Sequence, residues 1–340
     1  MARPHQKNQT SQSAESKKAT EFSVAFYAQV PPEDIAGWKP QDLNTAAGSI
    51  YGFAQDRKAG EQKVRIFTPD EKKDGWHAPY TVIQIVNDDS PFIVDSITAE
   101  LAFQNLTIDI LFHPVLHVVR DQSGKMGALG KDRGAISIAE SYMFIGLEQT
   151  ISADRAAKLK TRLLDVLNDV KAATGDWRSM TSKMDDVIKE QAKSLHEEQE
   201  FLKYLKANNF TFLGYRELEF AREGSKTQSR AVVGGDLGVL RNNKDLFFGQ
   251  GVDSPEVQAL KRSPSSVMIS KVIDQYATVH RRVPLDAISV KIADKNGNLT
   301  GMHLFVGLFT SSTYSCRTGE VPMVREKVSQ TVKRSGFVPG

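Results

Sequence analysis

The segment that most constrains the fold runs from residue 80 to residue 97, where an apolar, β-branched run leads through a short polar loop into a helical pattern. Residues 80–86 have the composition of a buried strand. Beyond the loop, apolar residues recur at helical spacing: Phe92, Ile93, Ile97, Leu101 and Leu106. The segment therefore predicts a strand, a polar loop and a helix in that order.

The polar loop has two interpretations. In the first it is a capped turn, because Asp89 or Ser90 can cap a helix and Pro91 suits the first helical position. In the second it binds an amino acid, because free N–H groups at a helix start attract carboxylates, while side chains such as Asp88 can grip an amino group. The candidate amino-acid-binding residues are Asn87, Asp88, Asp89, Ser90 and Pro91.

Composition places the chain among soluble, globular proteins. Its 340 residues allow about two or three domains, and its net charge of +3 is too small to indicate a nucleic-acid partner. The single cysteine excludes an internal disulfide framework. The chain contains no apolar run of the roughly 20 residues that span a membrane. Residues 1–21 are mostly polar and lack a signal-peptide core, so we expect a disordered leader and a cytoplasmic protein.

Residues 22–76 predict a small helical block that includes a short strand at 63–67. Residues 77–177 then predict a strand, a helix, strands over 107–120 and 135–149, and a helix over about 152–174. This β-α-β-β-α order is that of a ferredoxin-like split βαβ unit, so the fold class is α+β. The final strand of such a unit is missing after Gly175. Either residues 63–67 or another part of the chain would supply it.

Residues 178–208 predict a charged helical connector, and residues 209–321 predict a β-rich module. Its expected strands are residues 210–220, 239–240, 267–273, 277–283, 287–293 and 299–309, with a short helix at about 253–263. Asn296-Gly297 favours a hairpin turn because both residues tolerate positive φ. Residues 322–340 predict the start of a helix that continues into sequence absent from this chain.

The known chemical motifs are incomplete in this chain. It has no dinucleotide fingerprint or Walker loop, so we expect no cofactor-binding residues. His113 and His117 share one side of a predicted strand but lack further metal ligands at suitable spacing. Cys316 has no histidine close in sequence and is interpreted as a free thiol. The basic cluster 280–282 is interpreted as a solvated or salt-bridged surface. We therefore expect no catalytic residues and no metal site.

Several segments together resemble one family. They are Val86-Asn87-Asp88-Asp89-Ser90-Pro91-Phe92-Ile93-Val94-Asp95-Ser96, Phe112-His113-Pro114-Val115-Leu116, Glu140-Ser141-Tyr142-Met143, Phe210-Thr211-Phe212-Leu213-Gly214-Tyr215-Arg216 and Thr278-Val279-His280-Arg281. In order and spacing they are similar to the N-terminal region of the large bacterial NAD-dependent glutamate dehydrogenases. The resemblance runs from about Phe22 to the last residue.

The resemblance implies that this chain is a fragment of a much longer enzyme. The full-length family enzyme oxidatively deaminates L-glutamate to 2-oxoglutarate with NAD, and its catalytic and NAD-binding parts lie far downstream. The family's N-terminal region is similar to ACT modules, some of which bind amino acids, followed by a PAS-like β-rich module. This implies a role in oligomer assembly and allosteric control. The implied partners are the missing catalytic part, further copies of the chain and an amino-acid effector, with no nucleic acid or membrane.

The resemblance also bears on the polar loop. Residues 89–92 are similar to the Asp-x-Pro-Gly loop of ligand-binding ACT domains, but Phe92 stands where that pattern has glycine. Glycine lets a ligand approach the backbone, and phenylalanine fills that space. Three hypotheses follow: a regulatory and assembly segment of a glutamate dehydrogenase, a stand-alone amino-acid sensor, and an active enzyme. The missing cofactor fingerprint argues against the third.

Overall fold

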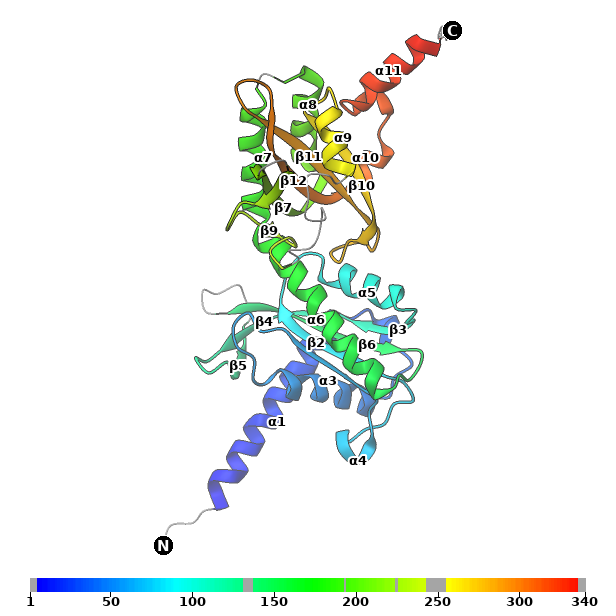
Figure 1. Cartoon of the computed structure of the whole chain (residues 1–340). Coiled ribbons are helices and arrows are strands. Elements are labelled where there is room, and N and C mark those ends of the chain that lie inside the picture. The colour runs from blue at the N-terminus through cyan, green and yellow to red at the C-terminus, as the bar shows by residue number, and fades with distance from the viewer. Residues whose placement is uncertain (1–4, 131–136, 193, 224–225, 243–254, 336–340) are drawn as a thin grey trace. The chain divides into compact units, whose positions relative to one another are not determined.

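The computed structural model describes residues 5–130, 137–192, 194–223, 226–242 and 255–335. The chain divides into two compact units, Met1–Asn168 and Asp169–Gly340. Each unit contains an antiparallel sheet with helices packed on it, so the predicted α+β class is confirmed (Figure 1).

The first unit, called unit 1 below, alternates helices and strands. Its elements are α1 (His5–Tyr27), α2 (Pro32–Ile35), α3 (Pro40–Ala54), β1 (Lys63–Phe67), α4 (Glu71–Asp74), β2 (Val82–Asp88), α5 (Ile93–Phe103), β3 (Ile108–Phe112), β4 (Val115–Arg120), β5 (Met126–Leu129), β6 (Ile138–Leu147) and the first part of α6 (Ala153–Gly175).

The sheet of unit 1 has the order β1-β2-β6-β4-β5, and β3 also pairs with β6. The strand predicted at residues 63–67 is therefore confirmed. It pairs antiparallel with β2, with Val64 opposite Ile85. In a split βαβ unit the final strand pairs antiparallel with the first strand. The edge beside β2 is thus occupied by a strand that precedes it in sequence.

Helices cover both faces of this sheet. On one face, Phe22 and Phe26 of α1 and Ile50 of α3 pack in one cluster with Val82 and Val86 of β2. Alternate residues of β2 point to the opposite face, where Figure 1 shows α5 and α6. Because both faces are covered, residues 82–87 are all buried. This double burial explains why β2 reads as a continuous apolar run rather than an alternating one.

The prediction of one strand over residues 107–120 is wrong. The segment forms two strands, β3 and β4, which are separated by His113 and Pro114. A proline has no N–H to donate to a ladder. The carbonyl of Pro114 still accepts a hydrogen bond from the Tyr142 N–H at 3.0 Å. The two strands consequently pair with different parts of β6, β3 near Phe144 and β4 near Glu140.

The disordered leader expected over residues 1–21 differs from the structure, which has helix α1 from His5 onward. The segment contains neither glycine nor proline between His5 and Tyr27, so nothing in it breaks a helix. At its C-terminal end, Phe22 and Phe26 are fully buried against the sheet. That packing gives the helix a tertiary anchor that its polar composition does not reveal.

The second unit, called unit 2 below, is richer in strands. After the last turns of α6 its elements are α7 (Trp177–Glu190), α8 (His196–Tyr204), η1 (Leu205–Asn209), β7 (Phe210–Glu223), β8 (Lys226–Ala231), β9 (Leu237–Gly238), α9 (Pro255–Arg262), β10 (Val267–Tyr276), β11 (Pro284–Ala293), β12 (Leu299–Phe309), α10 (Ser311–Ser315), η2 (Thr318–Glu320) and α11 (Val324–Ser335). The sheet order is β10-β11-β12-β7-β8, and β9 pairs with β7.

The helices predicted as a connector over residues 178–208 are an integral part of unit 2. Met180 and Met184 of α7 and Phe201 of α8 are buried in one cluster with Tyr215 and Phe305 of the sheet. The apolar spacing of this segment therefore marks a helix face that covers a sheet. Most of its charges lie on the remaining, solvated side, but Glu198 is buried and bonded to Ser266.

Two predicted strands of unit 2 are wrong, and one predicted turn is confirmed. The strand predicted at residues 239–240 is a turn that follows β9. Residues 277–283 form an irregular turn between β10 and β11, in which His280 has a φ of 70° and the Ala277 N–H donates to the Val283 carbonyl at 2.8 Å. The hairpin at Asp294–Gly297 joins β11 to β12, with Gly297 at a φ of 81°. Asp294 Oδ1 accepts the N–H groups of Asn296 and Asn298, both at 2.8 Å, which closes the hairpin.

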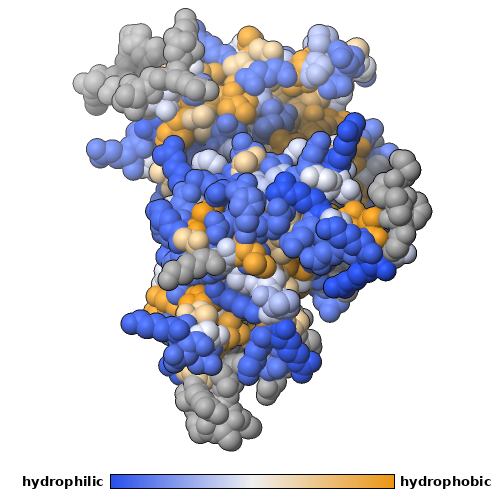
Figure 2. Space-filling model, turned by 90° about the horizontal axis from the view of Figure 1, so that it is seen from above, coloured by the Kyte–Doolittle hydropathy of each residue, from blue (hydrophilic) through white to orange (hydrophobic). Residues whose placement is uncertain are grey.

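The outer surface is mainly hydrophilic in the view of Figure 2, with smaller apolar areas between the charged residues. Large apolar side chains that are more than half exposed include Val24, Trp177, Leu195, Val233 and Tyr314. Across the residues described by the structure, no helix combines the length and the apolar character that a membrane crossing requires.

Candidate functional site

The predicted site lies where β2 ends and α5 begins. Asn87 and Asp88 are the last residues of β2, and α5 starts at Ile93. The N-cap residue is Phe92, which is in the left-handed conformation with a φ of 71° and makes no side-chain capping hydrogen bond. The N-cap position therefore falls at Phe92 rather than at the predicted Asp89 or Ser90. The backbone turns into the helix at Phe92. The Phe92 carbonyl accepts hydrogen bonds from the Ser96 N–H at 2.9 Å and from the Ser96 hydroxyl at 2.6 Å.

Phe92 has a left-handed backbone conformation at the position where the similar Asp-x-Pro-Gly motif has glycine. Glycine adopts a positive φ without steric cost, whereas other residues pay about 1–2 kcal/mol. The loop has therefore kept the backbone shape of the glycine pattern while carrying a half-buried aromatic side chain. Its ring occupies the volume that a glycine would leave open.

The polar residues of the loop are largely engaged within the chain. The Asn87 side chain donates to the Asp88 carbonyl at 3.0 Å. The Asp88 carboxylate forms an ion pair with Arg57, and the Asp88 side chain remains 43% exposed. The Asp89 N–H donates to the Ala139 carbonyl at 2.9 Å, and the Ser90 hydroxyl donates to the Pro91 carbonyl at 3.4 Å.

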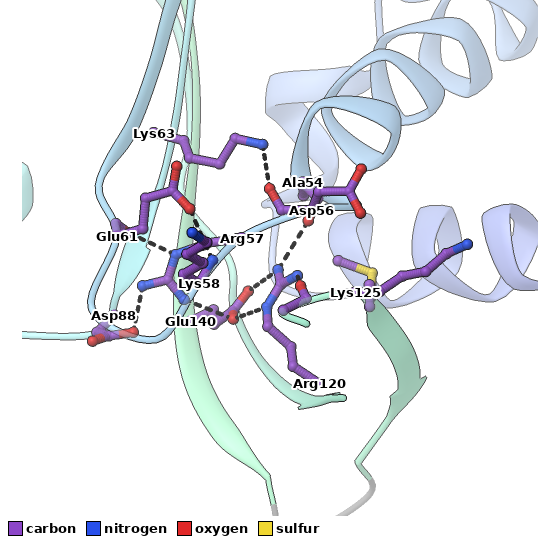
Figure 3. A network of polar contacts seen from close by, with 12 residues as sticks. Ala54, Asp56, Arg57, Lys58, Glu61, Lys63, Asp88, Arg120, Lys125 and Glu140 are labelled. Atoms are coloured by element: carbon purple, nitrogen blue, oxygen red, sulfur yellow. Dashed lines mark hydrogen bonds and ion pairs between the residues drawn. The ribbon is translucent and has the colours of Figure 1, made fainter. Parts of the chain in front are cut away.

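Arg57 is the residue that connects this loop to the interior of unit 1 (Figure 3). Its side chain is fully buried, with Nη1 2.8 Å from Glu140 Oε1 and Nη2 paired with Asp88. Its Nε donates to the Glu61 carbonyl at 2.8 Å. A guanidinium that is fully buried requires such partners, because an unpaired buried charge is strongly unfavourable.

Glu140 lies at the centre of the network, on β6. Arg120 donates to it twice, from Nε to Oε1 at 2.6 Å and from Nη2 to Oε2 at 2.8 Å. The Tyr142 hydroxyl donates to Oε2 at 2.7 Å. Arg120 also binds the carbonyls of Ala54 and Gln55 at 3.0 and 3.2 Å, which are acceptors left open at the end of α3. The network therefore ties the end of α3, the end of β4 and the polar loop to β6.

These contacts keep the network charged. Burial by itself would raise the pKa of Glu140, but hydrogen bonds from Arg120 and Tyr142 and the charges of Arg120 and Arg57 bring that pKa below its ordinary value. Burial and the neighbouring Glu140 raise the pKa of Tyr142, so its phenol keeps its proton. With its donors matched to acceptors, this network is built to hold structure together. It presents no nucleophile beside a base.

Sequence reasoning missed Arg57, Arg120 and Glu140. The available signal was Glu140, a carboxylate next to the apolar run of a strand expected to be buried, because such a residue needs a cationic partner. The identity of the partners had no sequence signal. Arg57 lies 83 residues from Glu140, and Arg120 lies 20 residues from it.

The other predicted candidates are placed as follows. His113 Nε2 lies 2.7 Å from the Ser141 hydroxyl, and burial lowers the pKa of this histidine although the nearby Asp89 opposes the shift. Arg281 and Arg282 donate to the carbonyls of Phe309 and Ala277, at 2.7 and 3.1 Å, so both hold the turn before β11.

Cys316 is a free thiol and is partly buried. It donates to the Thr313 carbonyl at 3.1 Å. Among the described residues, no group of three or more histidine, cysteine, aspartate or glutamate side chains is arranged to hold a metal ion.

The comparison with protein families gives a match within unit 1. Residues 22–163 match the family model described as glutamate dehydrogenase, ACT1 domain. That stretch includes Arg57, Asp88, Arg120 and Glu140. The matched domain therefore contains the polar loop together with the network beneath it.

Two curated relatives match nearly the whole chain. The NAD-specific glutamate dehydrogenase of Halomonas elongata is 29% identical over 330 residues, and that of Pseudomonas aeruginosa is 28% identical over 338 residues. Each match covers 94% of this chain and 20% of the relative. The chain thus spans about a fifth of the length of these relatives.

Similarity to solved structures is weak. A GAF domain of nlh2 from A. aeolicus, in an inactive state, aligns with 45% of this chain and 91% of its own length at 14% identity and a TM-score of 0.22. The curated relatives and the ACT1 match agree with the resemblance predicted from the sequence. Over nearly its whole length the chain is similar to NAD-specific glutamate dehydrogenases, and its residues 22–163 match the glutamate dehydrogenase ACT1 domain.

Proposed function

We propose that this chain is a non-catalytic regulatory and assembly segment of an NAD-dependent glutamate dehydrogenase. The observation that carries the proposal is the ACT1 match over residues 22–163 within a chain similar to a fifth of each curated relative. NAD would be used by the rest of the enzyme, whose catalytic part is the first proposed partner. Further copies of the chain are the second.

The contacts of the polar loop favour assembly over effector binding at this position. An amino group that binds at Asp88 would compete with Arg57, whose buried guanidinium would then lose one of its two carboxylate partners. The ring of Phe92 fills the place of the motif glycine. In this proposal the loop stabilises unit 1, and the exposed apolar side chains of the two units are candidate contacts with other chains.

Two measurements test the proposal. The purified chain, supplied with NAD and L-glutamate, is expected to form no NADH, and any turnover that scales with the chain concentration would overturn the non-catalytic assignment. Sedimentation velocity over a wide concentration range is expected to show self-association. A chain that stays monomeric throughout, and that does not bind the separately produced catalytic part, would overturn the assembly role.

The alternative, amino-acid sensing by the loop, has its own test. Calorimetric titration of the chain with a panel of amino acids is compared with the same titration of Asp89→Ala, since Asp89 is exposed and its side chain can be removed without opening the core. We expect no saturable heat from the wild-type protein. Saturable heat for one amino acid that disappears in Asp89→Ala would make residues 87–91 an effector site.

A further inference from the structure

We draw no further inference here: the strongest candidate, the apolar stripe of Val324, Val328 and Val332 along helix α11 at the end of unit 2, has no buried member, and nothing in the part of the chain that the structure describes shows what covers it.

Discussion

Arg120 and Glu140 form a doubly hydrogen-bonded ion pair inside unit 1, with Nε 2.6 Å from Oε1 and Nη2 2.8 Å from Oε2. The Glu140 side chain is fully buried and that of Arg120 is 4% exposed. Because Arg57 and Tyr142 also donate to Glu140, this carboxylate balances two buried guanidinium groups at once. Glu140 is therefore the acceptor that both arginines share, and Asp88 is a second carboxylate partner of Arg57.

Removal of that acceptor is expected to destabilise unit 1 strongly. Glu140→Ala leaves Arg57 and Arg120 buried without their shared partner, and breaking a buried pair in this way costs about 3–5 kcal/mol. Urea unfolding followed by the fluorescence of Trp38 and Trp76, in a Trp177→Phe background, measures the free energy of unfolding of unit 1. Glu148→Ala, at an exposed position just after the same strand, is the control and is expected to cost less than about 1 kcal/mol. Similar losses in the two variants would refute the central role of Glu140.

The network also predicts a pH dependence. The pKa of Glu140 is lowered in the folded state, so the unfolded chain binds the proton more tightly, near its ordinary pKa of about 4.3. The stability contributed by the charged carboxylate is present above that pH and is lost as the pH falls through the folded pKa. The difference in unfolding free energy between wild type and Glu140→Gln should therefore shrink on acidification below about pH 4.3. A difference that stays constant or grows would show that Glu140 does not titrate in this way.

Substitutions at Phe92 test whether the polar loop has a left-handed backbone conformation at this position. Phe92→Gly and Phe92→Ala both remove the ring, but only glycine adopts the φ of 71° without strain. Phe92→Gly is therefore expected to be more stable than Phe92→Ala by about 1 kcal/mol, measured by urea unfolding of unit 1. If alanine is the more stable replacement, the loop does not hold a left-handed residue in solution.

Two glycines of unit 2 have similar backbone conformations but different surroundings, so their substitutions can be compared. Gly234 and Gly238 have φ values of 75° and 61°, but a Cβ at Gly238 would lie 2.0 Å from the Leu213 carbonyl oxygen, whereas Gly234 has open space around it. Gly234→Ala is expected to cost about 1 kcal/mol, from the backbone alone. Gly238→Ala should cost a further 1–3 kcal/mol or so, because β9 must move away from β7. Thermal unfolding of the two variants by circular dichroism makes the comparison, and equal losses would refute the close approach.

The sequence predicted the local elements where a periodic pattern was strong. The strand 63–67, the strand before the polar loop and the hairpin at Asp294–Gly297 were all found, because each depends on residues close in sequence. The α+β class followed from their order. Errors came where a local pattern was overruled, as at Pro114 within an apparently continuous strand and at residues 277–283, where buried apolar residues lie in a turn.

The candidate site shows the same division. The sequence located the polar loop and noticed the phenylalanine in place of a glycine. It did not indicate that the Asp88 carboxylate is taken by Arg57, a residue 31 positions earlier. The binding role of residues 87–91 stays a prediction.

By itself, then, the sequence determined the helices and strands that have a strong periodic pattern and the place of the polar loop, since hydrophobic periodicity and turn chemistry act over a few residues. The tertiary structure alone decided which charges meet. Glu140 meets Arg120 because β4 pairs with β6, and Arg57 reaches Glu140 from the segment between α3 and β1. Glu217 meets His303 because β7 pairs with β12 in one register. Such contacts are set by strand pairing between distant segments, for which a single sequence carries no local signal.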